Sequence, residues 1–408
     1  MSRNAVIREA ARETPVVDQV DVLVAGGGPA GIAAALAAAR AGARTMLMER
    51  YGYLGGMITG ANVVAVLGCG DGYGPKAGGI TVEIRERLRK LGAITAPNEC
   101  GDYSVDPEVF KWQAVEMLLE AQVTLRLHTL ACEPVLEKGR VVGVLTESKS
   151  GRQAVGATAV VDATADADLA WRAGCRCDND PHEVTLTLSI EGIDKQRAAE
   201  FGRQSPKEYR AIVEEASRLN GGVMLGHTRL LKGIDVTDAV ALTRAEIQLR
   251  RECFAALAYL RAHMPGHEHA RVGLTCPQLG VRLSRRVRGE YVLADDDLRS
   301  SRHFHDGIAR LGVYFPDWGP IYAIRGLDYD LPYRSLVPEM VEGLLIVGRC
   351  VSADYVAANT LRLIVPCLAT GQAGGAAAAI AARDNCPARR VPVLALREVL
   401  QSQDVLLG

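Results

Sequence analysis

The sequence has few aromatic residues, no excess charge of either sign and no closely spaced pair of cysteines of the Cys-x-x-Cys type. Phe, Trp and Tyr make up 5% of the 408 residues, and 47 basic residues stand against 48 acidic ones. Without a positive excess to neutralise phosphates, nucleic acid is not expected as the main partner. Scattered cysteines argue against a zinc ribbon, a disulfide-exchange pair and a cysteine-ligated iron–sulfur cluster, and we expect no metal site.

Charge is also missing from two long stretches, residues 22–39 and 363–382. Each is long enough to cross a bilayer, but neither has the leucine, isoleucine and phenylalanine density of a membrane span. The first holds four glycines and a proline, and the second holds Pro366 and two adjacent glycines. We therefore expect no membrane span. Residues 1–19 carry six charged side chains and no apolar core, which argues against a signal peptide and predicts a cytoplasmic protein.

Glycine is the residue present in excess. Of the 42 glycines, 15 fall between Gly26 and Gly79, a density that needs a backbone reason. The chain length predicts two domains rather than one small module. Apolar periodicity predicts a β-α-β opening at residues 20–25, 30–41 and 45–48, followed by helices at 80–91 and 107–121. A small antiparallel meander is expected from the runs at residues 123–128, 134–137, 141–148 and 153–162, and two helices at 195–220 and 237–263 in a charged middle third. The chain then returns to a core strand at 341–347, an alanine-rich helix at 366–383 and a helical tail at 394–407.

Gly26, Gly28 and Gly31 form a G-x-G-x-x-G pattern between the first predicted strand and helix. In such a loop the first glycine allows a tight turn, the second lets the backbone approach a pyrophosphate, and the third lets helix and strand pack closely. Glu49 ends the second predicted strand, 18 residues after Gly31, and is placed to hydrogen-bond a ribose. Together these features predict a dinucleotide site.

A second glycine pair, Gly55-Gly56, follows the ribose-binding strand and precedes Met57. An extended FAD needs backbone clearance there for its phosphates and ribityl chain, whereas a nicotinamide cofactor does not, so the pair favours FAD over NAD. On these residues the chain resembles the glutathione-reductase-type FAD proteins. Among them it is similar to the broad FAD-dependent oxidoreductase family that is related to fumarate-reductase-like flavoproteins.

The resemblance extends over nearly the whole length. Residues 162–166 (DATAD) resemble the family's D-A-T-G-D segment, and residues 282–291 resemble its R-x-S-R-R-x-x-G-E-Y segment. Residues 333–338, 348–353 and 366–374 resemble its C-terminal signature. One position departs from the pattern, because Ala165 stands where the family usually has glycine. Close approach of that turn to the cofactor is therefore an open question.

The resemblance implies an α/β fold. We expect a Rossmann-like FAD-binding domain, in which a parallel sheet with helices carries the small antiparallel meander, and an inserted α+β substrate domain. Residues 1–176 would begin the FAD-binding domain, residues 177–333 would form the substrate or cap domain, and residues 334–408 would complete the first domain and end in a helical tail.

The resemblance also implies the cofactor contacts. The backbone of Ala131 would meet the adenine, Gly348 and Arg349 would lie by the ribityl chain and pyrophosphate, and the helix near Pro366 would direct its N-terminus at the flavin N1 and O2 edge. That polarity suits the negative charge that appears there on reduction. The full expected set is Gly26, Gly28, Pro29, Ala30, Gly31, Glu49, Arg50, Gly55, Gly56, Met57, Ala131, Ala163, Thr164, Gly348, Arg349, Arg362 and Cys367.

Since a flavin carries the hydride chemistry, the protein must supply orientation, charge complementarity and a group that handles a proton. The candidates are His227, Arg285, His303 and Tyr355. Arg285 belongs to an arginine-rich run in which at least one member can clamp a carboxylate, while a solvated or cofactor-facing arginine is the alternative. His263, His267 and His269 are interpreted as a surface loop rather than as metal ligands.

We expect a dehydrogenase or reductase that transfers a hydride between flavin N5 and a small organic substrate, which can be anionic. No second G-x-G-x-x-G follows a strand, so electrons would come from the substrate or from an electron-transfer partner. Two alternatives stay open: an FAD monooxygenase that uses NAD(P)H without a second Rossmann domain, and the flavin subunit of a larger redox complex. Gly68, Gly70, Gly72 and Gly74 are interpreted as a loop over the flavin or substrate entrance.

Overall fold

A mostly parallel sheet lies at the centre of the computed structural model, which describes residues 10–68, 78–98, 101–180, 182–219, 230–316 and 326–408. Its first strand, β1 (Val16–Ala25), pairs in parallel with β2 (Thr45–Met48) and with β8 (Gly151–Asp162). The strand order is β5-β2-β1-β8-β7-β6, with β5 at Thr124–Arg126, β6 at Leu130–Glu137 and β7 at Arg140–Ser148. The antiparallel β6-β7-β8 meander expected from the sequence is confirmed.

The C-terminal part of the chain returns to this first sheet. Strand β18 (Leu344–Ile346) pairs in parallel with the last residues of β8, so that Ile346 lies opposite Asp162. The carboxyl ends of β1, β8 and β18 therefore meet at one edge of the sheet. In open α/β sheets that edge is where ligands bind.

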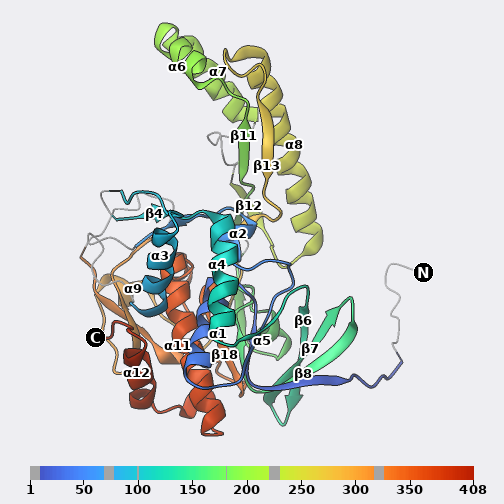
Figure 1. The fold of residues 1–408 in the computed structure, drawn as a ribbon, viewed down its shortest axis with the longest axis vertical. Coiled ribbons are helices and arrows are strands. Elements are labelled where there is room, and N and C mark those ends of the chain that lie inside the picture. The colour runs from blue at the N-terminus through green and yellow to red at the C-terminus, as the bar shows by residue number, and fades with distance from the viewer. Residues whose placement is uncertain (1–9, 69–77, 99–100, 181, 220–229, 317–325) are drawn as a thin grey trace.

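Two helices rich in alanine and glycine cover the sheet with backbone close to backbone. They are α1 (Pro29–Arg40) and α11 (Ile364–Arg383), which lie side by side in Figure 1. A Cβ added at Gly371 would lie 2.1 Å from the Ala30 carbonyl oxygen, and one at Gly375 would lie 2.0 Å from that of Ala34. Gly371 meets Ala30 and Gly375, four residues later, meets Ala34, four residues later in α1. The two helices therefore run parallel, and their N-termini point to the same edge of the sheet.

Helix α11 covers most of the second uncharged stretch, residues 363–382. By length and composition it could cross a bilayer, and 94% of its apolar window is buried inside the protein. The helix begins two residues before the expected Pro366. Proline is tolerated there because the first-turn N–H groups of a helix have no intrahelical acceptor.

Short elements connect β2 to the meander: α2 (Met57–Gly60), β3 (Ala65–Val66), α3 (Gly79–Lys90), β4 (Tyr103–Ser104) and α4 (Pro107–Glu120). The predicted start of α4 is confirmed, since the Asp106 carboxylate accepts the N–H groups of Glu108 and Val109 at 2.8 and 3.1 Å. Of the glycines predicted to form an entrance loop, Gly68 is described and would place a Cβ 2.7 Å from Val313. Gly70, Gly72 and Gly74 lie outside the described residues.

The turn after β8 is organised by a buried carboxylate. Asp162 accepts the N–H groups of Thr164, Leu169 and Ala170 as well as the Thr164 hydroxyl, at 2.6 to 3.0 Å. These bonds join the end of β8 to helix α5 (Asp168–Arg172). Burial raises the pKa of Asp162, and the four donors act against that rise.

The middle third forms small sheets and a projecting arm. In Figure 1 helices α6, α7 and α8 extend away from the rest of the protein together with β11 and β13. The single helix expected at residues 195–220 is wrong, because Pro206 starts a second helix there. The elements are β9 (Cys177–Asn179), β10 (His182–Thr185), β11 (Leu188–Glu191), α6 (Lys195–Gln204), α7 (Pro206–Leu219), β12 (Leu231–Ile234), α8 (Ala239–His263), β13 (Arg271–Thr275), β14 (Gly280–Val281), β15 (Arg285–Val287), α9 (Asp295–Arg299), β16 (Gly307–Leu311) and β17 (Tyr329–Pro332).

The remaining elements are short and surround α11. They are the 3-10 turn η2 (Tyr333–Leu336), the turn η3 (Gly348–Cys350), helix α10 (Tyr355–Leu361), the turn η4 (Ala388–Arg390) and helix α12 (Val393–Ser402). The Gln403 amide, just after α12, donates to the Ala37 carbonyl oxygen at 3.2 Å. The expected helical tail is thus packed against the α1–α11 pair.

The α1–α11 contact predicts that Gly375→Ala destabilises the protein, although helix propensity alone predicts the opposite. Alanine is favoured over glycine in a helix interior by about 1 kcal/mol, but Gly375→Ala would drive a methyl group into the backbone of α1. We expect the free energy of unfolding to fall by about 1–3 kcal/mol, as in other overpacked cores. Denaturant unfolding followed by circular dichroism measures this change.

Gly202→Ala is the matched control in the arm. Gly202 is also helical, and its added Cβ would lie 3.3 Å from the ring of Tyr209, which can shift. We expect this variant to be as stable as the parent or more stable. Equal stability of the two variants would contradict the close packing of α1 on α11.

Candidate functional site

The first glycine loop lies at the carboxyl edge of the sheet and divides its glycines into two roles. A Cβ on Gly26, whose φ is +107°, would lie 2.4 Å from the Ala163 carbonyl oxygen, and one on Gly31 would lie 1.8 Å from the Gly26 carbonyl oxygen. Gly28 is different, because a Cβ added there would lie no closer than 3.8 Å to any neighbouring atom, the Cα of Gly56. The first and third glycines therefore serve packing, and the second leaves backbone accessible to a ligand.

The second glycine pair is bound to the first loop. The Gly55 N–H donates to the Gly27 carbonyl oxygen at 2.8 Å, and both Gly55 (φ +107°) and Gly56 (φ +51°) have left-handed backbones. A Cβ on Gly56 would approach the Cα of Gly28 to 3.0 Å. Met57 then begins α2. The two loops thus form one cradle with no side chain between their backbones.

Glu49 contacts the first glycine loop of this cradle. Its carboxylate accepts the Gly27 N–H at 2.7 Å and the Tyr51 N–H at 3.0 Å, and the residue is 9% exposed. A carboxylate has about four lone-pair sites, so two sites remain for the hydroxyls of a ribose. The carbonyl oxygen of Glu49 accepts the Thr129 N–H at 2.9 Å, which places the start of β6, and with it Ala131, next to this strand end.

Arg50 follows Glu49 and adds positive charge at the same edge. Burial lowers the pKa of Arg50, but the combined effect of Tyr51, Asp166, Glu49 and Asp168 is larger and raises it. Arg50 thus lies within electrostatic range of the turn that follows β8.

That turn contains Ala163, Thr164 and the departing residue Ala165. The Ala163 N–H donates to the Ala25 carbonyl oxygen at 2.9 Å, which continues the β1–β8 ladder beyond the strands. Ala165 has a φ of +71°, a left-handed conformation that glycine adopts without strain and alanine adopts at a cost. The backbone at Ala165 therefore has the left-handed conformation that the family's glycine favours, although alanine carries a Cβ.

Arg349 fixes this turn to two other segments. Its guanidinium donates to the carbonyl oxygens of Ala165 at 3.2 Å and Val281 at 2.6 Å, and to the Asp166 carboxylate at 2.6 Å. Ser284 also donates to Asp166, at 2.6 Å. The side chain expected beside the pyrophosphate is thus 7% exposed and is held by protein acceptors.

Gly348 joins the N-terminal ends of the two central helices. Its φ is +77°, its N–H donates to the Thr370 hydroxyl at 3.0 Å, and a Cβ there would lie 2.8 Å from Cβ of Ala30 and 3.9 Å from Sγ of Cys367. Pro29, Ala30 and Cys367 therefore lie in the first turns of two parallel helices that meet at Gly348. Because helix N-termini carry positive partial charge, both dipoles favour an anion at this edge.

The predicted catalytic residues that the structure describes, Arg285, His303 and Tyr355, have no described contact with one another. Tyr355 begins α10, and its ring lies 5.6 Å from that of His182. Arg285 donates to Asp166 and Asp168 and lies 4.5 Å over Trp171. His227 lies outside the described residues.

His303 lies at the opposite end of β16 from α10. It is half exposed and pairs with Asp330 at 3.3 Å. Strand β16 begins at Gly307, and beyond its other end the ring of Phe315 lies 5.5 Å from the Arg362 guanidinium. His303 therefore has no described contact with the glycine cradle and stays a prediction.

Sequence reasoning missed two residues at this edge, Gln278 and His182. The Gln278 amide donates to the Tyr53 hydroxyl at 3.4 Å and to the Gly56 carbonyl oxygen at 3.5 Å, so the segment before β14 contacts the second glycine loop. Val281 in β14 pairs with Val184 in β10, and β10 begins at His182. Neither residue belongs to a motif with a sequence signal, and only the pairing of β10 with β14 carries them to the site.

Two arginines, Arg282 and Arg362, lie within electrostatic range of each other beside these strands. Burial and the charge of Arg362 lower the pKa of Arg282 to about 9, while Glu183, 4.0 Å away, acts in the opposite direction. Burial and the charge of Arg349 lower the pKa of Arg362 to about 10. Arg362 donates to the Asn359 side chain at 3.3 Å. Like charges held together in a partly buried place favour a bound anion.

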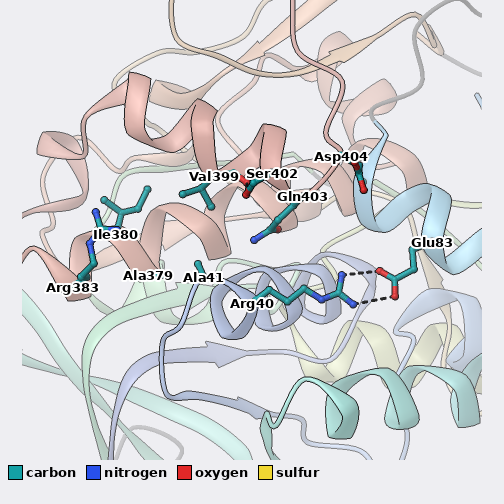
Figure 2. Close-up of a pocket in the computed structure, with 11 residues that line it drawn as sticks. Arg40, Ala41, Glu83, Ala379, Ile380, Arg383, Val399, Ser402, Gln403 and Asp404 are labelled. Atoms are coloured by element: carbon teal, nitrogen blue, oxygen red, sulfur yellow. Dashed lines mark hydrogen bonds and ion pairs between the residues drawn. The ribbon is translucent and has the colours of Figure 1, made fainter.

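A surface cavity of about 460 Å³ lies elsewhere, at the C-terminal end of α1 (Figure 2). Its wall includes Arg40, which pairs with Glu83 at 2.7 Å. Helix α1 has 12 residues and is therefore about 18 Å long, which separates this cavity from the glycine cradle. Among the described residues there is also no group of three or more His, Cys, Asp or Glu side chains suited to a metal ion.

The cradle fits FAD. It offers a glycine backbone that a Cβ would fill, an acidic residue at the end of β2, and two helix N-termini at one edge. The sequence profile of the FAD dependent oxidoreductases matches residues 21–400. The chain belongs to this FAD dependent oxidoreductase family. FAD is accordingly its cofactor, and the protein is an enzyme.

Two curated proteins are similar to this chain over part of its length. Digeranylgeranylglycerophospholipid reductase 1 of Methanopyrus kandleri is 33% identical over 208 residues, which are 50% of this chain and 53% of that protein. Reductase 2 of the same organism is 36% identical over 153 residues, 36% of this chain and 37% of the relative. The chain thus matches about half of the first relative's length and about a third of the second's.

Two solved structures are similar to this chain at low sequence identity. A geranylgeranyl bacteriochlorophyll reductase-like protein of Thermoplasma acidophilum is 14% identical with a TM-score of 0.42, over 95% of this chain and 82% of that one. A flavocytochrome c3 fumarate reductase is 15% identical with a TM-score of 0.41, over 90% and 79%.

Glu49 supplies a prediction for this flavoenzyme. Glu49→Gln would turn one acceptor of the Gly27 and Tyr51 N–H groups into a donor and would weaken any bond to ribose hydroxyls. We expect the dissociation constant for FAD to rise at least tenfold. Titration of the apoprotein with FAD, followed by flavin fluorescence, measures it.

Glu83→Gln is the control, since that carboxylate pairs with Arg40 at the far end of α1 (Figure 2). It should leave the FAD dissociation constant unchanged. If Glu49→Gln binds FAD as tightly as Glu83→Gln, Glu49 does not contact the cofactor.

Proposed function

We propose that the enzyme exchanges a hydride between FAD and a small organic substrate that carries an anionic group. The proposal rests on one observation above all: the charge of Arg362 lowers the pKa of Arg282, and the charge of Arg349 lowers the pKa of Arg362, so three positive charges lie near one another beside β10 and α10. Glu183 is the carboxylate that acts on both Arg282 and Arg362. An anion between the arginines would remove this repulsion.

The protein's own residues would bind and orient the substrate. Arginine recognises carboxylate and phosphate groups with two parallel N–H donors, so Arg282 and Arg362 can hold an anionic group in a defined direction. Arg362 precedes α11 by two residues, and Cys367 lies in the first turn of that helix. Bound FAD supplies the two-electron chemistry at N5. A substrate held by Arg362 would therefore lie near the edge that both helix N-termini face.

The relatives support reduction rather than oxygenation. Both proteins of Methanopyrus kandleri are named as reductases of a phospholipid, a class of molecule that carries an anionic phosphate. An anionic group is thus the feature that a small acid and such a lipid share. Hydride exchange with an anionic substrate is the function that we propose, in either direction.

Anaerobic bleaching of the flavin tests this proposal. The purified protein is first denatured to confirm that it releases FAD, and the holoenzyme is then mixed without oxygen with a panel of carboxylic acids, organic phosphates, amines and enones. We expect loss of the oxidised flavin absorbance with an anionic member of the panel, or its return when photoreduced enzyme meets an anionic acceptor. Turnover only with oxygen, NADPH and an aromatic compound would favour a monooxygenase instead.

Arg282→Gln gives a residue-level prediction. Loss of one charge-assisted hydrogen bond costs about 1.5–3 kcal/mol, so KM for the anionic substrate should rise about tenfold or more. Arg288→Gln removes a charge from the same run, but Arg288 is exposed and pairs with Asp178 at 2.9 Å. KM of that control should not change. An unchanged KM in Arg282→Gln, determined from steady-state rates, would contradict the role of this arginine.

A further inference from the structure

His182 is a buried histidine whose ring nitrogens have no hydrogen-bond partner of acceptable geometry among the described residues. The residue is 5% exposed. A buried polar group without a partner costs free energy, and such groups persist where they have a ligand or a catalytic role. His182 therefore needs an explanation beyond packing.

The surroundings of His182 connect it to the proposed substrate site. Its strand, β10, pairs with β14, where the Val281 carbonyl oxygen accepts from Arg349 at 2.6 Å. On the other side β10 pairs with β12, where Lys232 forms an ion pair with Glu183 at 3.2 Å. The ring of Tyr355, which is 44% exposed, lies 5.6 Å away. His182 thus lies beside the exposed tyrosine of α10 and within electrostatic range of Arg282 and Arg362.

The charges around His182 keep it neutral. Burial, followed by the positive charges of Arg362 and Arg282, lowers the pKa of His182 to about 4, while the charge of Glu183 acts in the opposite direction. A neutral imidazole has one nitrogen free to accept a proton. An anion on the arginines would weaken the repulsion that opposes protonation.

We propose that His182 accepts the substrate's proton, with Tyr355 as the cover between the imidazole and solvent. The inference rests on the proposed function. In the oxidative direction bound FAD would supply the acceptor for a hydride from a substrate carbon, and the neighbouring atom would lose a proton to a ring nitrogen of His182. The substrate gains a double bond, and the imidazolium is offset by the substrate's anionic group. Reduction returns the same proton to the substrate.

The first test compares two buried histidines. His182→Gln should lower kcat about a hundredfold, within the range of a lost general base, while FAD content and KM stay near those of the parent. His267→Gln is the matched control, because His267 is 6% exposed and lies beyond α8 in the arm. It should leave kcat unchanged. Equal kcat in the parent and in a folded His182→Gln enzyme would overturn the inference.

The second test reads the proton directly and does not depend on turnover. In holoenzyme labelled with ¹³C at histidine Cε1, the signal that disappears in His182→Gln reports the titration of this residue. Addition of succinate, a dicarboxylate, should raise its pKa by about one unit or more, and Arg282→Gln should abolish that rise. A His182 signal that titrates near 6.5 with and without succinate would overturn the inference.

The pH profiles and a tyrosine variant separate the remaining outcomes. Since kcat/KM reports the free enzyme and kcat reports the substrate complex, the acidic limb of kcat should lie at higher pH than that of kcat/KM. Tyr355→Phe keeps the ring and should keep both limbs, whereas their loss in this variant would assign the proton to the tyrosine. If no compound in the panel reacts with the parent enzyme, the proposed function fails. An active parent with an equally active His182→Gln rejects His182 alone.

Discussion

The close approach of backbones without intervening side chains is the constraint on which the rest of this structure depends. Gly26 contacts the backbone of Ala163, Gly371 and Gly375 contact the backbone of α1, and Gly348 contacts Ala30. These contacts hold the ends of β1, β8 and β18 and the first turns of α1 and α11 at one edge. A methyl group at such a position would separate the elements, so the excess of glycine is a property of the packing and of the cofactor cradle together.

That packing also sets the electrostatics of the site. Because α1 and α11 run parallel, their positive N-terminal ends coincide, and the turn after β8 brings Asp166 to Arg349. The buried Asp162 carboxylate maintains the turn by accepting four hydrogen bonds. The charge of Arg349 lowers the pKa of Arg362, and the charge of Arg362 lowers that of Arg282, beside β10. The proposed substrate site is thus linked to the helix pair through Arg349.

Local patterns predicted much of the fold because their causes are local. The G-x-G-x-x-G loop, the Asp106 cap of α4 and the alternation of the meander each act within a few residues, and the structure has all three. Resemblance to the FAD-dependent family predicted the cofactor. Arg349 shows the limit, because its partners Ala165, Val281 and Asp166 come from two distant segments.

The sequence alone thus determined the class of protein, the cofactor and the order of elements along the chain, since short-range backbone rules and motif spacing suffice for these. Only the tertiary structure decided which side chains share a site. His182 has no motif around it, and it reaches Arg282, Arg362 and Tyr355 because β10 pairs with β14 and α10 lies beside them. Burial, which removes its hydrogen-bond partners and lowers its pKa, is a property of that packing and of no segment by itself.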